Sequence, residues 1–174
     1  MQDQNKNGLA KHIGVSNFNQ AKLAELFTLP GQRPEMNQVK LHPYLPQHQL
    51  VSFCKENELL VTAYSPLGSP DSRAEKHAQD PKLLEDGAVM AIAQKHGATL
   101  GQVLIAWSIA RGIAVIPKSV NQVRIVENFA AAEINLDAAD MAQLDAIGTS
   151  HRFVDGTFFT GPKSPYRLTD LWDS

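Results

Sequence analysis

Polar side chains able to bind a ligand stand at or just after each of four short apolar runs in this sequence. They are Ser16 and Asn17 after the first run, Gln38 in the second, Tyr64 and Ser65 after the third, and Lys118 and Ser119 after the fourth. In a parallel sheet or barrel, the carboxyl ends of the strands form the ligand-binding face, so we expect these groups to lie near one another. Together they suit a ligand with a carboxamide, a flat ring and a phosphate. Singly, each also fits an ordinary turn residue, strand partner or core aromatic.

The most specific of these groups is the pair Lys118 and Ser119, which directly precedes a predicted helix. The first amides of a helix lack partners and lie at the positive end of the helix dipole. Arg124 follows early in the same helix, so a phosphate placed there would meet backbone N–H groups, an ammonium and a guanidinium. The pattern predicts a phosphate site, with an ordinary capped helix start and solvated charges as the alternative.

Several common kinds of site are absent from the sequence. It contains no G-x-G-x-x-G loop, no G-x-x-x-x-G-K-[ST] loop and no C-x-x-C pair. His42 and His48 are six residues apart on a proline-containing loop, which is a poor spacing for shared metal ligation. We therefore predict no metal site and neither of the two common nucleotide-binding loops.

Composition narrows the class of protein further. The 174 residues are 43% hydrophobic with a net charge of −2, which fits one globular domain over residues 1–174 and gives no footprint for nucleic acid. No run approaches the 18 apolar residues of a membrane span, so no membrane association is predicted. The single cysteine, Cys54, is typical of a reducing compartment and predicts a cytoplasmic location.

Strand-like and helix-like patterns alternate along the chain, which favours an α/β fold with a parallel sheet. The predicted strands are 13–15, 36–41, 59–63 and 113–116, and the third reads as buried on both faces. The predicted helices are 20–27, 47–57, 87–96, 99–111, one capped by Ser119 and Gln122 that reaches about residue 132, and 137–147. Residues 65–81 form a long loop of the functional kind, and the tail 149–174 has no clear periodicity.

Blocks of the sequence resemble the aldo-keto reductases. In family order they are Gly14-Val15-Ser16-Asn17-Phe18, Asn37-Gln38-Val39, His42-Pro43-Tyr44, Ala63-Tyr64-Ser65-Pro66-Leu67-Gly68-Ser69, and Ile116-Pro117-Lys118-Ser119 with Arg124 and Glu127-Asn128. They span nearly the whole chain, and the run 117–128 is among the family's most specific signatures. The segment from 152 to 173 resembles the C-terminal tail of bacterial aldehyde- and alcohol-reducing members.

The resemblance implies a (β/α)8 TIM-barrel fold that binds NADPH in an extended pose. It assigns the nicotinamide carboxamide to Ser16, Asn17 and Gln38, the face of the nicotinamide ring to Tyr64, and the pyrophosphate to Ser65, Leu67 and Ser69. It assigns the 2′-phosphate, which favours NADPH over NADH, to Lys118, Ser119 and Arg124, and the adenine to Asn128 with Glu127 beside it. The tail aromatics Phe153, Phe158, Phe159 and Trp172 are implied as walls of a substrate pocket.

The resemblance also implies what the chain lacks. Family catalysis uses an Asp, a Tyr, a Lys and a His that all precede the Gly-Val-Ser-Asn block, and only fifteen residues precede Ser16 here. Tyr44, Tyr64 and Lys118 match other family positions, so no catalytic residue is assigned to this chain. We therefore expect the C-terminal half of the barrel, with strands five to eight, the closing helix and the tail, because a complete barrel needs about 250 residues.

Three functions follow as hypotheses. In the first, the chain is part of an NADPH-dependent reductase of small aldehydes and ketones. In the second, it is a non-catalytic NADPH-binding or interaction module, whose exposed strand edges favour self-association or pairing with an N-terminal half. In the third, it is an unrelated phosphate-binding barrel lyase or isomerase, with no preference for NADPH.

Overall fold

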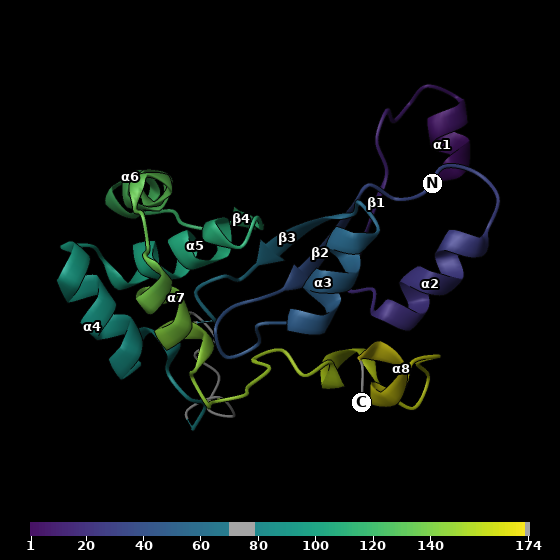
Figure 1. The fold of residues 1–174 in the computed structure, drawn as a ribbon. Coiled ribbons are helices and arrows are strands. Elements are labelled where there is room, and N and C mark those ends of the chain that lie inside the picture. Colours follow the sequence, from purple (N-terminus) through teal and green to yellow (C-terminus); the bar gives the residue numbers. More distant parts are fainter. Residues whose placement is uncertain (70–78, 173–174) are drawn as a thin grey trace. The chain divides into compact units, whose positions relative to one another are not determined.

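The structure, a computed structural model, describes residues 1–69 and 79–172 and divides the chain into two compact units (Figure 1). The first unit comprises Met1–Val39, Gln47–Thr62 and Val154–Ser174, and the second comprises Lys40–Pro46 and Ala63–Phe153. Positions 70–78 of the predicted long loop 65–81 lie outside the described residues. Just after this predicted loop, residues 83–85 form a 3₁₀ turn, η2 (Leu83–Glu85).

The strands follow one another in the sheet in the same order as in the chain, β1-β2-β3-β4. They are β1 (Gly14–Ser16), β2 (Met36–Lys40), β3 (Leu60–Tyr64) and β4 (Ala114–Ile116). β1 and β2 are parallel, with Gly14 opposite Met36 and Ser16 opposite Gln38. The α/β class and the parallel pairing confirm the prediction from alternating patterns. The third strand is less buried than predicted, because Leu60 at its start is 68% exposed.

The first unit holds short helices around its strands (Figure 1). They are α1 (Gln2–Lys6), α2 (Gln20–Thr28), α3 (His48–Glu56), the 3₁₀ turn η4 (Thr157–Phe159) and α8 (Leu168–Leu171). Asn19 caps α2 by accepting a hydrogen bond from the Lys22 amide at 2.8 Å, as its residue type predicts. Phe27 of α2 stacks on Phe53 of α3 with the ring centroids 6.2 Å apart, so these two helices share an aromatic contact.

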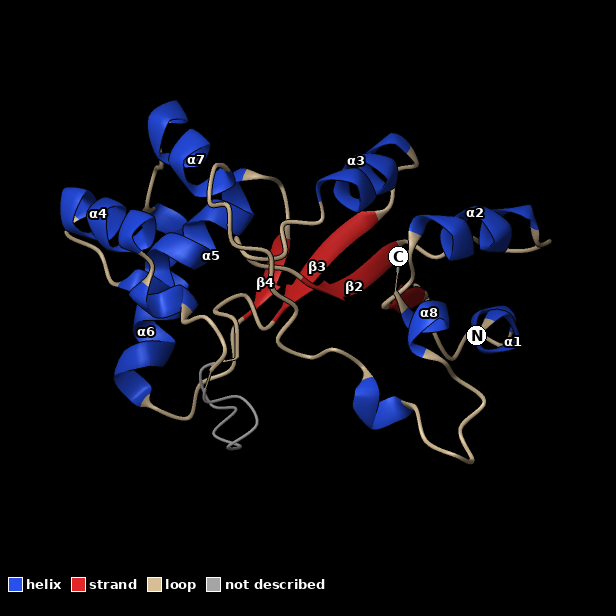
Figure 2. Cartoon of the chain, turned by 90° about the horizontal axis from the view of Figure 1, so that it is seen from below, coloured by secondary structure: helices blue, strands red, loops and turns tan. Residues whose placement is uncertain are grey.

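The second unit is built around one apolar helix. Its elements are α4 (Gly87–His96), α5 (Leu100–Ala110), α6 (Gln122–Ala130), the 3₁₀ turn η3 (Ala131–Glu133) and α7 (Ala138–Asp145). Six consecutive residues of α5, 103–108, are buried, and Figure 2 shows α4, α6 and α7 arranged around this helix. The Trp107 indole in α5 donates a hydrogen bond to Asp145 of α7 at 2.9 Å and stacks under the Arg111 guanidinium. Polar contacts therefore hold this large core residue in place.

The predicted start of α6 was wrong, because its N-cap is Asn121, whose side chain accepts from the Arg124 amide at 3.1 Å. The α-helix ends at Ala130 and η3 follows directly over residues 131–133, so the predicted end near 132 falls within this continuous helical segment. Ser119 accepts from the Asn121 amide instead, because it stands too far from the first helical turn to cap it. The short elements η4 and α8 in the tail were also missed, because helical turns of three and four residues are too short to show a periodic pattern.

Among residues 1–69 and 79–172, no helix is long and apolar enough to cross a membrane. Within the same residues, no three His, Cys, Asp or Glu side chains group as metal ligands.

Candidate functional site

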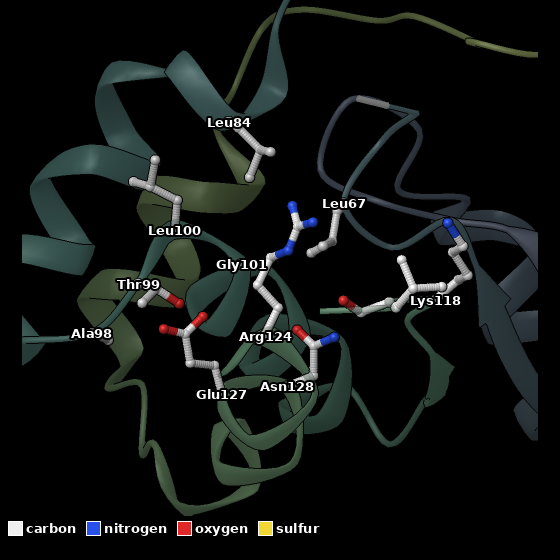
Figure 3. Close-up of a pocket in the computed structure, with 12 residues that line it drawn as sticks. Leu67, Leu84, Ala98, Thr99, Leu100, Gly101, Lys118, Arg124, Glu127 and Asn128 are labelled. Carbon is white, nitrogen blue, oxygen red and sulfur yellow. The ribbon is translucent and has the colours of Figure 1, made fainter. Parts of the chain in front are cut away.

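A cavity of about 750 Å³ lies in the second unit between the loop after β3, the start of α5 and the pocket-facing side of α6 (Figure 3). Its lining is Leu67, Leu84, Ala98, Thr99, Leu100, Gly101, Lys118, Ser119, Val120, Arg124, Glu127 and Asn128. This volume lies within the range of small-molecule sites, and the lining combines an apolar floor with a few polar groups, as such sites do.

The cationic part of the cavity comes from the segment that joins β4 to α6. Lys118 follows β4 directly after Pro117, and Arg124 is the third residue of α6. Figure 3 shows the Arg124 guanidinium pointing between Leu84 and Leu67. Both cationic side chains are exposed, so an anion in the cavity can reach them from solvent.

The start of α6 adds backbone donors to these cations. Asn121 satisfies the Arg124 amide, which leaves the amides of the first two helical residues pointing out of the helix. These amides lie at the positive end of the helix dipole, where anions are stabilised. The junction therefore presents an ammonium, a guanidinium and amide donors together, which is an arrangement that suits a phosphate.

The side chain that completes the capping box of α5 also links α5 to α6. Thr99 accepts from the Gln102 amide, and the Gln102 side chain accepts from the Thr99 amide at 2.9 Å. The same Gln102 side chain donates to the Glu127 carbonyl of α6 at 3.2 Å. Gln102 thus links α5 to α6, and it is a positioning residue that the sequence analysis did not single out.

The loop that follows β3 is held by a buried lysine. Lys40, 1% exposed, donates from Nζ to the Ser69 hydroxyl at 2.7 Å and to the Gly68 carbonyl at 3.4 Å. Its Nζ also lies 5.7 Å from the centroid of the Tyr64 ring. Burial, together with the nearby Arg152 charge, lowers the pKa of Lys40 to about 8. Tyr64 is the last residue of β3, and the predicted cofactor residues Ser65, Leu67 and Ser69 lie on the loop that follows it. Lys40, which anchors this loop, was not singled out in the sequence analysis.

Ser65 in this loop carries a strained backbone. Its φ is 48°, in the left-handed region that non-glycine residues seldom adopt. Asn17, directly after β1, has φ 58°, which asparagine tolerates better. Residues in sparsely populated φ/ψ regions cluster at ligand-binding sites, so the positive φ angles of both residues favour a ligand-binding role for these turns.

The first unit brings Ser16 and Asn17, at the end of β1, next to Gln38 in the middle of β2. The Ser16 hydroxyl donates to the Gln38 carbonyl at 2.9 Å, and the Asn17 amide donates to the same oxygen at 2.9 Å. Fully buried Asn37 donates from its side chain to the Phe18 carbonyl at 2.8 Å, which holds the turn after β1. Asn37 has no predicted role, and its only signal in the sequence is an amide inside an apolar strand.

The Tyr44 side chain in the second unit is buried, and its hydroxyl is engaged in a hydrogen bond. Its hydroxyl donates to Asp86, the N-cap of α4, at 2.9 Å. Burial and this hydrogen bond raise the pKa of Tyr44 to about 12, so it is a poorer acid than free tyrosine. Burial, then the charge of Lys40, lowers the pKa of nearby His42 to about 3, which keeps its imidazole neutral.

The tail aromatics are divided between the two units, and their predicted place in a substrate pocket stays a prediction. Phe153 is 7% exposed and packs against His42 with the ring centroids 5.1 Å apart, so it is a core residue of the second unit. In the first unit, Phe158 is 89% exposed and contacts Phe159 edge-on, while the Trp172 indole donates to the Asp155 carbonyl.

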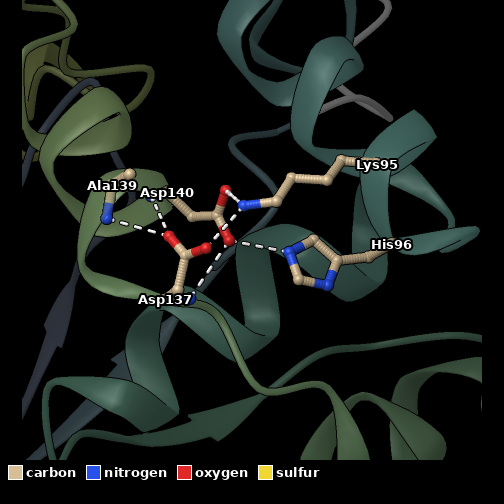
Figure 4. Close-up of polar contacts among 5 residues, drawn as sticks. All are labelled: Lys95, His96, Asp137, Ala139 and Asp140. Carbon is tan, nitrogen blue, oxygen red and sulfur yellow. Dashed lines mark hydrogen bonds and ion pairs between the residues drawn. The ribbon is translucent and has the colours of Figure 1, made fainter.

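A second polar cluster joins α4 to the start of α7 (Figure 4). Lys95 contacts Asp137 and Asp140 at 2.7 Å each, and His96 contacts the second oxygen of Asp140 at 2.7 Å. The Asp140 carboxylate is buried, which acts to raise its pKa, but the hydrogen bonds from Lys95, His96 and the Asp137 amide lower it to about 2. Asp137 and Asp140 also form the capping box of α7, so the cluster fastens two helices.

The predicted cofactor residues therefore fall into three groups. The first group lines the cavity and comprises Leu67, Lys118, Ser119, Arg124 and Asn128. The second group lies at the end of β3 and on the loop after it, and comprises Tyr64, Ser65 and Ser69. The third group lies in the first unit and comprises Ser16, Asn17 and Gln38.

Comparison with known sequences identifies the class of protein that carries this arrangement. A sequence profile described as the Aldo/keto reductase family matches residues 1–149, so the chain belongs to the aldo/keto reductase family. An aldo/keto reductase of Synechocystis sp. is 47% identical over 167 residues, which cover 95% of this chain and 51% of that protein. Aldo-keto reductase family 1 member A1 of Mus musculus is 42% identical over 147 residues, which cover 84% of this chain and 45% of that protein.

A solved structure extends the relation to the fold. The crystal structure of MGS-M4, an aldo-keto reductase from a deep-sea metagenome library, superposes with a TM-score of 0.76 at 37% identity, covering 86% of this chain and 53% of that one. The α/β fold is thereby that of the (β/α)8 family. The chain spans about half the length of the curated relatives it matches.

Proposed function

We propose that this chain forms the cofactor-binding, C-terminal half of an NADPH-dependent reductase that converts small aldehydes and ketones to alcohols. When bound, NADPH would supply the hydride that such a reduction needs at the carbonyl carbon, and a proton donor would be needed at the carbonyl oxygen. Membership of the aldo/keto reductase family supports the reaction class. A cytoplasmic location is part of the proposal.

The observation that carries the proposal is the cavity beside the start of α6. The adenosine end of a dinucleotide fits a cavity of about 750 Å³ in size. Lys118 and Arg124 supply the charges that a 2′-phosphate needs, and a guanidinium binds phosphate oxygens in a fork. Glu127 and Asn128 supply an acceptor and an amide for the edge of the adenine. A cofactor without the 2′-phosphate gains nothing from the two cations, so this lining favours NADPH over NADH.

Each unit, taken by itself, offers further groups of the kind that the family resemblance assigns to the cofactor. Ser65 and Ser69 offer hydroxyls for the pyrophosphate, and Lys40 positions the loop through its bond to Ser69. Tyr64 presents an aromatic ring for stacking. In the first unit, the hydroxyl and amides of Ser16, Asn17 and Gln38 match the donors and acceptors of a carboxamide.

We assign no proton donor to the described residues. The Tyr44 hydroxyl is occupied by Asp86 and its pKa is raised to about 12, so it is unsuited to protonating a carbonyl oxygen near neutral pH. Tyr64 is assigned to the ring of the cofactor. The acid and base of the reaction are therefore proposed to lie outside these residues. The same observation favours a second candidate function, in which the chain binds NADPH without catalysing a reaction.

The test uses the purified 174-residue chain with NADPH and an aromatic aldehyde such as nitrobenzaldehyde. We expect NADPH fluorescence to change on binding and no NADPH to be consumed. Absence of NADPH binding would overturn the cofactor proposal. Turnover that Tyr44→Phe or Tyr64→Phe abolishes would overturn the assignment of the proton donor elsewhere. To separate the two candidates, the chain is expressed with its upstream reading frame. Aldehyde reduction by that longer protein supports the reductase, and binding without reduction supports the non-catalytic module.

A further inference from the structure

Lys40 places a positive charge inside the second unit. It is the last residue of β2, and its side chain is buried. Its Nζ lies 5.7 Å from the centroid of the Tyr64 ring and 5.7 Å from that of Phe153, so the ammonium is within cation–π range of two rings. Because its bonds to Ser69 and Gly68 hold Nζ at this place, the charge has a fixed position beside Tyr64.

Lys40 keeps this charge at neutral pH. Burial, followed by the charge of Arg152, lowers the pKa of Lys40 to about 8, which is still above 7. Nearby His42 stays neutral, because burial lowers its pKa to about 3. The other titratable groups that the structure describes around this cluster are Tyr64, the Tyr44–Asp86 pair and the His151–Asp80 pair. The ammonium is therefore the main form of Lys40 below about pH 8.

Tyr64 offers only part of its surface to solvent. Its side chain is partly exposed, whereas the Lys40 side chain next to it is buried. A flat ring that arrives from solvent therefore stacks on the side of Tyr64 away from the ammonium. The centroids of stacked rings lie about 4.5–7 Å apart, so such a ring lies on the order of 10 Å from Nζ. At that distance Lys40 acts on the ring through its charge and not through contact.

The two oxidation states of a nicotinamide cofactor differ in charge at this ring. The reduced ring is uncharged and the oxidised ring carries one positive charge, whereas the adenosine and phosphate groups of the two forms are the same. Coulomb repulsion between two unit charges at about 10 Å changes a binding constant about 2-fold at the dielectric constant of water and about 10-fold at an effective value of 20. A fixed cation beside Tyr64 therefore discriminates between the two forms.

We propose that the Lys40 ammonium makes this site bind the reduced nicotinamide cofactor more tightly than the oxidised one. This assignment rests on the proposed function, because it takes Tyr64 as the residue that stacks on the nicotinamide. The direction suits a reductase, since the site holds the form that donates hydride and releases the form that has lost it. The competing explanation is that Lys40 acts only through its bond to Ser69, which orders the loop equally for both forms.

Isothermal titration calorimetry of the purified 174-residue chain with NADPH and NADP⁺ gives the ratio of the two Kd values. Lys40→Gln removes the charge and keeps an amide donor for Ser69, so it should lower the preference for NADPH about 2- to 10-fold. The matched control, Ser69→Ala, removes the bond and keeps the charge. It should weaken the binding of both cofactors alike and leave the ratio unchanged. Circular dichroism checks that both variants are folded.

The pH dependence of the wild type tests the charge without any substitution. Lys40 is protonated below its pKa and neutral above it, so the preference for NADPH should fall as pH rises from 7 to about 9.5. In Lys40→Gln the preference should stay constant over the same range. NMR of isotope-labelled lysine side chains reads the titration of Lys40 directly. By linkage, its midpoint should be lower with NADP⁺ bound than with NADPH bound.

The possible results separate this proposal from the proposed function. A Lys40→Gln ratio equal to that of the wild type, or a wild-type ratio that stays constant with pH, would overturn the role of the charge alone. An equal change of the ratio in Ser69→Ala would show that Lys40 acts through the loop, and would overturn it as well. A wild-type chain that binds neither nucleotide would instead overturn the proposed function, and the role of Lys40 with it.

Discussion

Replacing Arg124 with methionine is expected to weaken NADP⁺ binding and leave NAD⁺ binding unchanged. The substitution removes the guanidinium that points into the cavity but keeps most of the length of the side chain. The helix cap survives, because Asn121 binds the backbone amide of residue 124 and not its side chain. The variant therefore isolates the contribution of one charge.

The magnitude follows from the exposure of this side chain. A hydrogen bond to a charged group contributes about 1.5–3 kcal/mol, and solvent screening of an exposed Arg124 places the effect at the lower end. We expect a loss of about 1–2 kcal/mol, which is roughly a 5- to 30-fold rise in the Kd for NADP⁺. Because exposed charges are screened within about 10 Å at 0.1 M salt, the difference between variant and wild type should shrink as salt increases.

Isothermal titration calorimetry with NADP⁺ and NAD⁺ provides the measurement. The matched control is Arg33→Met, which removes an exposed arginine of the first unit that lies over Phe27, outside the cavity. An equal loss of affinity for both nucleotides would show that Arg124 does not read the 2′-phosphate. Unchanged affinity for both would refute its place in the site.

Three further results are expected. Gln102→Ala removes half of the α5 capping box and the hydrogen bond to the Glu127 carbonyl. It should therefore lower the thermal midpoint of unfolding by a few degrees and the affinity for NADP⁺ about 2- to 5-fold. The control Gln94→Ala on α4 should change neither quantity. The pKa of Asp140 is lowered to about 2, so its ion pairs stabilise the fold above the ordinary pKa near 4 and are lost as pH falls toward 2. Wild-type stability measured in urea should drop over that interval by about 1 kcal/mol more than that of Asp140→Asn, and parallel pH profiles would contradict this. Gly68→Ala should lower the free energy of unfolding by about 1–2 kcal/mol, because Gly68 has φ +83° and a Cβ there would lie 3.0 Å from the Phe153 ring. The control Gly87→Ala places its Cβ in open space and should leave the stability unchanged or raise it.

Local signals in the sequence predicted most of the elements and the groups at the ends of the strands. The helices predicted over 20–27 and 99–111 correspond to α2 and α5, whose starts carry the local signals of the caps Asn19 and Thr99, because a cap and its helix are neighbours in the chain. The start of α6 was harder, since Ser119 and Asn121 are both good caps. Only the backbone conformation of the turn decides which one reaches the Arg124 amide.

Contacts between distant residues left no such signal. Lys40 reads as the polar end of a strand, and its burial depends on a loop 29 residues further on. The bond from Gln102 to Glu127 likewise joins residues 25 positions apart. The exposed face of α6 looks in the sequence like any amphipathic helix, because periodicity predicts an apolar face without saying whether anything covers it.

The cavity beside α6 is proposed to select a cofactor by its 2′-phosphate. The most direct measurement is the ratio of the Kd values of the wild-type chain for NAD⁺ and NADP⁺, compared with that ratio in a variant lacking both Lys118 and Arg124. We expect the wild type to bind NADP⁺ at least about tenfold more tightly, since two charged contacts act on one phosphate, and the double variant to lose this preference. Equal affinities in the wild type, or a preference that survives in the double variant, would contradict the account.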